Sequence, residues 1–149
     1  MTTNNQNIVD RLNKLIAVAE DGKQGYENAS EEIKDTVILN SFMLFAKDRA
    51  LYANQLRKLV YELNGESEYS SGDTAGLLHR VWMDLKSVFT NGDAESIIKA
   101  CITGEEAAVK EYKEALEDLS LQEVHTKLIA EQLQGIQQTL AHIKSHIQG

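Results

Sequence analysis

Apolar residues recur every three or four positions along most of the chain, which is the spacing of amphipathic helices. The first run keeps this spacing through residues 19–26, A-E-D-G-K-Q-G-Y, although that stretch contains two glycines. A turn there would shift the phase of the pattern, so the spacing predicts one helix over residues 5–33. The alternative is a helix-turn-helix, because glycine disfavours a helix by about 1 kcal/mol relative to alanine. The first seam consists of Ile8, Leu12, Leu15, Ala19, Gly22, Tyr26, Ala29 and Ile33.

The same pattern predicts four further helices, over residues 36–64, 74–89, 94–118 and 121–147. Residues able to cap a helix precede three of them, at Asp35–Thr36, Asp93 and Ser120. Asn-Gly pairs at 64–65 and 91–92 are typical of helix ends. The stretch 65–73, G-E-S-E-Y-S-S-G-D, is predicted to be a loop because it is rich in Gly, Ser and acidic residues.

The lengths of the links between these helices predict their arrangement. The first two long helices and the last two are joined by short links, so each pair is expected to form an antiparallel hairpin. The loop and short helix between the pairs are long enough to run back along a bundle. The sequence therefore predicts an all-α fold, a single domain over residues 1–149, and a ferritin-like four-helix bundle whose long crossover contains one short extra helix. A plain up-down bundle is the alternative.

Composition narrows the classes of partner and location. The chain has 149 residues, no proline and a formal net charge of −8, so its average field would repel nucleic acid and anionic membranes. Cys101 is the only cysteine, which suits a reducing compartment. The polar N-terminus, M-T-T-N-N-Q-N, does not resemble a secretion signal, and no apolar run approaches the roughly 20 residues of a membrane span. A cytoplasmic protein without nucleic-acid or membrane partners is expected.

Ferritin-like bundles commonly hold a di-iron or di-manganese centre, which requires Glu-x-x-His motifs on two helices. The positions three residues before His79, His125, His142 and His146 hold Gly76, Gln122, Thr139 and Ile143, so the motif is absent. On the predicted seams, the places for ligands hold Ala19, Arg49 with Tyr52, and the neighbourhood of Leu133 and Ile136. Only Glu105 remains, in an E-x-x-A-x-x-x-Y pattern similar to that of rubrerythrin-like relatives of ferritin. No metal and no cofactor are expected.

Arg49 and Glu105 both lie on otherwise apolar seams, at similar depth in the predicted bundle. An unpaired buried charge is very costly, so the two side chains are expected to meet each other. Tyr26, Tyr52 and Tyr112 are placed to hydrogen-bond to them. The prediction is a polar core cluster in the space of a lost metal site. The alternative is that Arg49 extends to solvent and Glu105 lies on the surface.

Two metal-binding arrangements are weaker hypotheses. In one, Glu105 shares an ion with Glu20 or Glu106, but histidine ligands are missing. In the other, His142 and His146 form an i, i+4 pair on the last helix, with no third ligand nearby in the sequence. Exposed surface histidines are the simpler interpretation of that pair.

Two further features of the sequence bear on binding or chemistry. Cys101 lies on a seam, where a buried, inert thiol is expected rather than a nucleophile. His79, Arg80 and Trp82 form an H-R-x-W motif on the short helix. Trp82 is expected to anchor that helix to the bundle. A surface binding role for the three residues together is the alternative. The chain contains no Gly-rich phosphate loop, catalytic triad or CxxC motif.

Four motifs resemble those of an uncharacterised bacterial family of ferritin-like four-helix-bundle proteins, described as a domain of unknown function. They are L-x-x-L-I at 12–16, D-G-x-x-G-Y at 21–26, A-G-L-L-H-R-V-W-M-D-L-K at 75–86 and G-E-E-A-A-V-K-E-Y-K-E-A-L at 104–116. The resemblance covers residues 6–147 and implies the ferritin-like bundle and a bacterial source. It carries no established activity, and a stress-related role rests on analogy alone.

The function expected from these observations is that of a non-catalytic, metal-free ferritin-like bundle. It would act in stress-associated binding or in self-association, as a homo-oligomer or with an unidentified protein partner. A di-metal oxidase or iron-handling protein with an atypical site is the second hypothesis, and a bundle that binds a small apolar ligand is the third.

Overall fold

The computed structural model describes residues 2–66 and 76–148, and these residues form five α-helices. The helices are α1 (Thr2–Ser30), α2 (Thr36–Glu62), α3 (Gly76–Asn91), α4 (Ala94–Leu116) and α5 (Glu123–Gln148). The all-α class and the five helices predicted from the sequence are confirmed. Most of the predicted loop at 65–73 and the predicted start of the short helix at residue 74 lie outside the described residues, since these omit 67–75.

α1 is one continuous helix through both glycines of residues 19–26, so the prediction from the unbroken phase is confirmed. The helix ends at Ser30, three residues before the predicted end at Ile33, although Ile33 itself is buried. The five consecutive residues 15–19 are all buried. A helix buried on every side lies at the centre of a fold, and α1 indeed packs against α2, α3 and α4.

Two of the three predicted N-caps are present. The Asp35 carboxylate accepts hydrogen bonds from the backbone N–H groups of Val37 (2.9 Å) and Ile38 (3.1 Å) at the start of α2. The Asp93 carboxylate accepts one from the N–H of Ser96 (2.8 Å) at the start of α4. Each carboxylate satisfies backbone donors that have no partner within the helix and lies at the positive end of the helix dipole.

The predicted cap at Ser120 is wrong. The Ser120 hydroxyl instead donates to the Asp118 carboxylate (2.6 Å) within the turn that precedes α5. α5 begins at Glu123, and the His125 ring accepts a hydrogen bond at Nδ1 from the N–H of Gln122 (3.1 Å). A histidine three residues inside the helix therefore takes part of the role that the sequence assigned to a serine.

α2 ends close to its predicted stop, in a Schellman-type arrangement. The N–H of Gly65 donates to the carbonyl of Val60 (3.0 Å), and the N–H of Asn64 donates to that of Tyr61 (3.0 Å). Asn64, not Gly65, adopts the left-handed conformation, with φ of 59°. Asparagine tolerates this region better than other residues with a side chain, so the Asn-Gly pair stops the helix without strain at a bulkier residue.

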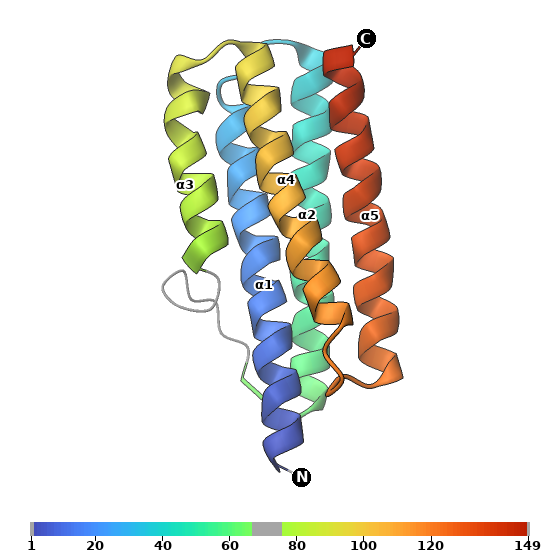
Figure 1. Ribbon diagram of the computed structural model, residues 1–149. Coiled ribbons are helices and arrows are strands. Elements are labelled where there is room, and N and C mark those ends of the chain that lie inside the picture. Colours follow the sequence, from blue (N-terminus) through green and yellow to red (C-terminus); the bar gives the residue numbers. More distant parts are fainter. Residues whose placement is uncertain (1, 67–75, 149) are drawn as a thin grey trace.

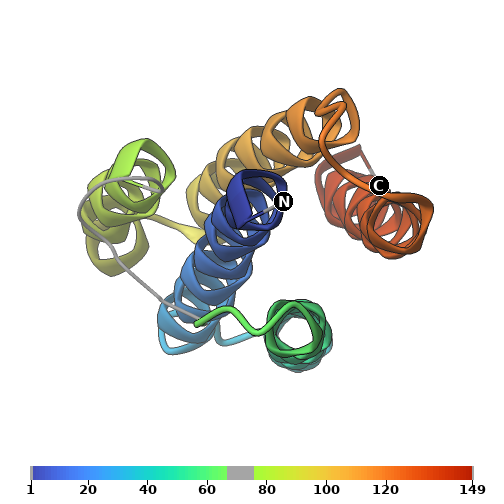
Figure 2. The same cartoon turned by 90° about the horizontal axis from the view of Figure 1, so that it is seen from below.

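The helices form two antiparallel hairpins, α1 with α2 and α4 with α5 (Figure 1). α2 and α4 run in the same direction. α3 lies on the outer side of the two hairpins and packs against α1 and α4. Seen along the helices, α2 stands at the edge of the assembly (Figure 2). It packs chiefly on α1 and meets α5 at few positions. Within the described part of the chain, no helix has an apolar stretch long enough to cross a bilayer.

Candidate functional site

The centre of the fold holds an ion pair between Arg49 of α2 and Glu105 of α4. Arg49 is 1% exposed and Glu105 is fully buried. The Arg49 Nη2 group donates to one carboxylate oxygen, Oε1, and the Tyr26 hydroxyl of α1 donates to the other, Oε2. Three helices therefore contribute to one carboxylate, and both of its oxygens have a donor. A burial this complete requires such pairing, since a lone buried charge is strongly unfavourable.

Gly22 makes the space that the Arg49 side chain occupies. A Cβ atom at position 22 would lie 2.9 Å from Arg49 Nη1, closer than two unbonded heavy atoms normally approach. The guanidinium carbon also lies 5.8 Å from the ring centre of Tyr26 and 6.0 Å from that of Tyr52, within the range of cation–π attraction. The seam glycine that looked like a helix breaker is thus the place where α1 receives the guanidinium group.

A second set of hydrogen bonds joins α4, α5 and α2 beside the ion pair. The Tyr112 hydroxyl donates to Gln132 Oε1 (2.7 Å). The amide nitrogen of Gln132 donates to the Tyr52 carbonyl (3.2 Å) and to Gln55 Oε1 (2.9 Å). The Tyr52 hydroxyl lies against Gly135, where a Cβ atom would come within 2.1 Å of it. Gln132 and Gly135 are therefore two of the positions at which α5 contacts α2.

Of the three tyrosines expected to hydrogen-bond to the ion pair, only Tyr26 does so. Tyr112 bonds Gln132, and Tyr52 offers its ring to Arg49 and its carbonyl to Gln132. Gln132 was not predicted, because the expectation for the last helix followed apolar residues such as Leu133 and Ile136. Residues His125, Ile129, Gln132, Ile136, Thr139 and Ile143 are buried, and Leu133 is buried beside them. The regular four-three spacing of the first six was a signal that could have identified Gln132.

Burial sets the protonation of the groups around Glu105. Burial alone would lower the pKa of Arg49, but the charge of Glu105 raises it above its usual value, so the guanidinium stays charged. Burial, with the Glu105 charge adding to it, raises the pKa of the Tyr26 hydroxyl and of the Cys101 thiol. Both groups therefore keep their protons at neutral pH. Both oxygens of Glu105 have a donor, and neither Tyr26 nor Cys101 is an activated nucleophile.

The hypothesis that Glu105 shares a metal ion with Glu20 or Glu106 is contradicted by the geometry. Glu20 pairs with Arg57 (3.2 Å) and Glu106 pairs with Lys144 (3.6 Å), both near the surface. Among the described residues, no three His, Cys, Asp or Glu side chains are grouped so that they could hold a metal ion. The cation that neutralises Glu105 is the Arg49 guanidinium.

His142 and His146 lie side by side near the end of α5, as their spacing indicated. Their ring centres are 5.2 Å apart, and His142 packs edge-on against Phe45 of α2, with ring centres 5.4 Å apart. His142 is exposed and His146 is half-buried. The aromatic contact with Phe45 gives this pair a packing role between α2 and α5.

Trp82 fastens α3 to the two hairpins. It is 5% exposed, and a Cβ atom at Gly25 of α1 or Gly104 of α4 would come within 2.2 Å or 2.4 Å of its ring. Trp82 therefore packs between α1 and α4, as the predicted anchor role requires, and the surface binding role of His79, Arg80 and Trp82 stays a prediction. Arg80 is exposed, and the side chain of His79 is not among those that the structure describes.

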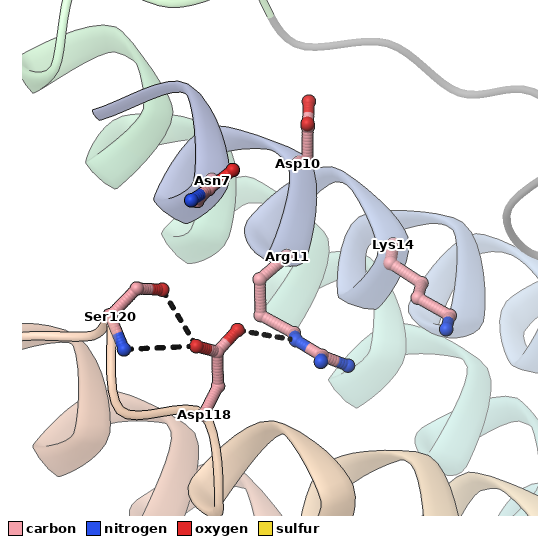
Figure 3. A pocket seen from close by; sticks show the side chains of 6 residues that line it. All are labelled: Asn7, Asp10, Arg11, Lys14, Asp118 and Ser120. Atoms are coloured by element: carbon pink, nitrogen blue, oxygen red, sulfur yellow. Dashed lines mark hydrogen bonds and ion pairs between the residues drawn. The ribbon is translucent and has the colours of Figure 1, made fainter. Parts of the chain in front are cut away.

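A shallow depression of about 390 Å³ lies where the first turns of α1 meet the link between α4 and α5 (Figure 3). Arg11 Nε contacts Asp118 Oδ2 at 3.0 Å across it, and Asp118 Oδ1 accepts from Ser120. Asp10 accepts a hydrogen bond from Gln6 (2.7 Å). The Arg11–Asp118 ion pair connects α1 to the second hairpin. Because these charged groups already have partners within the chain, the depression is a weaker candidate site than the core cluster.

Comparison with known proteins adds a family but no activity. A family model described as a domain of unknown function, DUF2383, matches residues 7–118. This region is well over half of the chain and includes Tyr26, Arg49 and Glu105, whereas α5 lies beyond it. No curated protein matches the chain.

Proposed function

From the premise that the chain belongs to DUF2383, a family of domains of unknown function, we propose that it is a non-catalytic, metal-free ferritin-like bundle. It acts through its surface, by binding or by self-association, and its core serves stability rather than chemistry.

The observation that carries this proposal is the position of Arg49. Its guanidinium group neutralises Glu105 at the centre of the two hairpins, where a ferritin-like protein would bind its metal ions. A divalent ion there would face a fixed positive charge at close range, and the Glu105 carboxylate already accepts hydrogen bonds at both oxygens. No group of three metal-ligating side chains lies there among the described residues. Carboxylate bridges from several helices are what di-metal centres require.

The topology supports the ferritin-like part of the proposal. The long helices run up, down, down and up in chain order, and α3 returns the chain along the outside between the two hairpins (Figure 1). One long crossover between two antiparallel hairpins distinguishes ferritin-like bundles from plain up-down bundles. α3 is then the short extra helix of that crossover.

Metal analysis of the protein, purified without a histidine tag, tests the metal-free proposal. The protein is supplied with Fe(II) or Mn(II), passed through a desalting column and measured by mass spectrometry for bound metal. The expected result is no metal above the level of a Glu105→Gln variant, which serves as the matched control. Two equivalents of iron or manganese in the wild type, lost in that variant, would establish the alternative of a di-metal protein. Oxygen consumption after addition of Fe(II) should likewise equal the buffer blank.

A further inference from the structure

α2 carries an exposed apolar stripe on the side opposite its buried face. Val37, Leu44 and Leu51 are 68%, 56% and 53% exposed. They are seven residues apart, nearly two helical turns, so they lie in one line along the helix. Met43, 57% exposed, flanks the middle of this line. We call these four residues the α2 stripe.

The α2 stripe points away from the rest of the fold. The buried residues of α2, among them Phe42, Arg49, Ala53, Leu56 and Val60, lie on the opposite side, where α2 packs on α1. α2 stands at the edge of the assembly in the view along the helices (Figure 2). Exposed apolar patches of this regularity commonly mark interaction sites.

The charge around the α2 stripe differs from that of the whole chain. The chain has a formal net charge of −8, yet α2 contains four cationic side chains and two carboxylates. Arg49 is buried in its ion pair and Arg57 contacts Glu20, which leaves Lys47 and Lys58 as exposed cations. The outer face of α2 is thus close to neutral. Two copies of an acidic protein repel each other least where such faces meet.

The stripe is also self-complementary. If two α2 helices pack antiparallel about a two-fold axis at Leu44, Leu44 meets its own copy and Val37 meets Leu51 of the other chain. On one flank Ser41 then lies opposite Asp48, and on the other Asn40 lies opposite Lys47. Neither flank places like charges against each other, which is a requirement of a symmetric interface.

We propose that two copies of this chain form an antiparallel dimer through their α2 stripes, with the two-fold axis at Leu44. This inference deepens the proposed function, on which it rests, by identifying self-association as the surface role and α2 as the surface. The patch is narrow, so the buried area is expected near the lower end for specific interfaces, about 1,200 Å² in total. The dimer should therefore dissociate on dilution.

Analytical ultracentrifugation over a range of concentrations tests the dimer. The wild type should approach twice the 16.6 kDa of one chain at high concentration. Leu44→Glu should remain a monomer, with dimer association weakened at least tenfold. Leu119→Glu is the matched control, because Leu119 is 99% exposed outside α2, and it should dimerise like the wild type. Circular dichroism must show the same helix content for all three proteins. A wild type that stays monomeric, or a Leu44→Glu variant that still dimerises, overturns the proposal.

Cysteine cross-linking tests the orientation. Leu44→Cys should form a disulfide between chains by itself. Val37→Cys and Leu51→Cys should each fail alone and cross-link when mixed, and self-cross-linking of Val37→Cys would indicate a parallel pair and contradict the two-fold model. Binding of monomers to phosphatidylglycerol vesicles through Leu44 would also overturn it. A metal-free monomer would contradict only this inference, whereas metal bound by both the wild type and Leu44→Glu would contradict the proposed function.

Discussion

The Arg49 guanidinium lies against Gly22, in a space that exists because residue 22 has no side chain. The same guanidinium neutralises Glu105, which also accepts the Tyr26 hydroxyl. A glycine on α1 therefore determines whether a cation from α2 can reach a carboxylate on α4. The polar cluster is a property of three helices together, and its stability can be tested by changing one partner at a time.

Replacement of Arg49 by methionine should destabilise the protein by about 3–5 kcal/mol, because it leaves Glu105 as a buried charge without a cation. The double variant Arg49→Met, Glu105→Gln should recover part of this loss, since no uncompensated charge remains. Urea unfolding followed by circular dichroism measures both. A neutral effect of Arg49→Met would contradict the buried pair, and equal losses in the single and double variants would show that Glu105 is not the group left unpaired.

Replacement of Gly104 by alanine should destabilise the protein by about 1–3 kcal/mol, because the new methyl group would overlap the Trp82 ring. Elsewhere in a helix the same change stabilises by about 1 kcal/mol, so the expected sign is unusual. The control is the same change in a Trp82→Ala background, where the overlap is gone and Gly104→Ala should be neutral or stabilising. If the change costs the same in both backgrounds, Trp82 is not the cause.

The Cys101 thiol should not react with Ellman's reagent in the folded protein and should react fully in denaturant. Cys101 is buried, and its raised pKa keeps the thiol protonated, which removes the nucleophilic thiolate. A Leu119→Cys variant provides the comparison, because that exposed position should react at once with one equivalent of reagent. Rapid reaction of the wild type under native conditions would mean that the core opens near Glu105.

The stability of the protein should fall as the pH is lowered from about 7.5 to about 5.5, across the ordinary histidine pKa of about 6.5. Burial lowers the pKa of His125 in the folded state, partly offset by Glu62, so the unfolded chain binds a proton at His125 more readily. His125 therefore contributes stability that is present above its unfolded pKa and is lost as the pH falls towards its lower folded pKa.

A His125→Gln variant is the control for this pH dependence. Glutamine keeps a side-chain acceptor for the N–H of Gln122 but does not titrate. The melting temperature of the variant should therefore change less than that of the wild type over the same range. Identical pH profiles for the two proteins would assign the effect to other groups.

The sequence predicted the helices well because their signals are local. The three-four spacing, the caps Asp35 and Asp93, and the Asn64-Gly65 stop each depend on neighbours within a few residues. The pairing of Arg49 with Glu105 could also be anticipated, since two charges on apolar seams have few alternatives to meeting each other.

What could not be predicted depends on contacts between distant helices. Gln132 can face the core although it is polar, because Tyr112, Gln55 and the Tyr52 carbonyl satisfy its amide. The space that the Trp82 ring occupies requires Gly25 on α1 and Gly104 on α4, two helices that are far apart in sequence. Neither fact is visible in the spacing of apolar residues alone, because both need the positions of three helices at once.

The position of the Trp82 ring between Gly25 and Gly104 also affects how the two hairpins can move relative to each other. The ring touches Gly25 in the first hairpin and Gly104 in the second, so α3 acts as a tie across the joint between the hairpins. Rotation of one hairpin against the other would displace the Trp82 ring from between the two glycines, and removal of the ring would permit that rotation. Undocking of α3 and loosening of the α1–α4 joint are therefore expected to be one motion with one energy barrier.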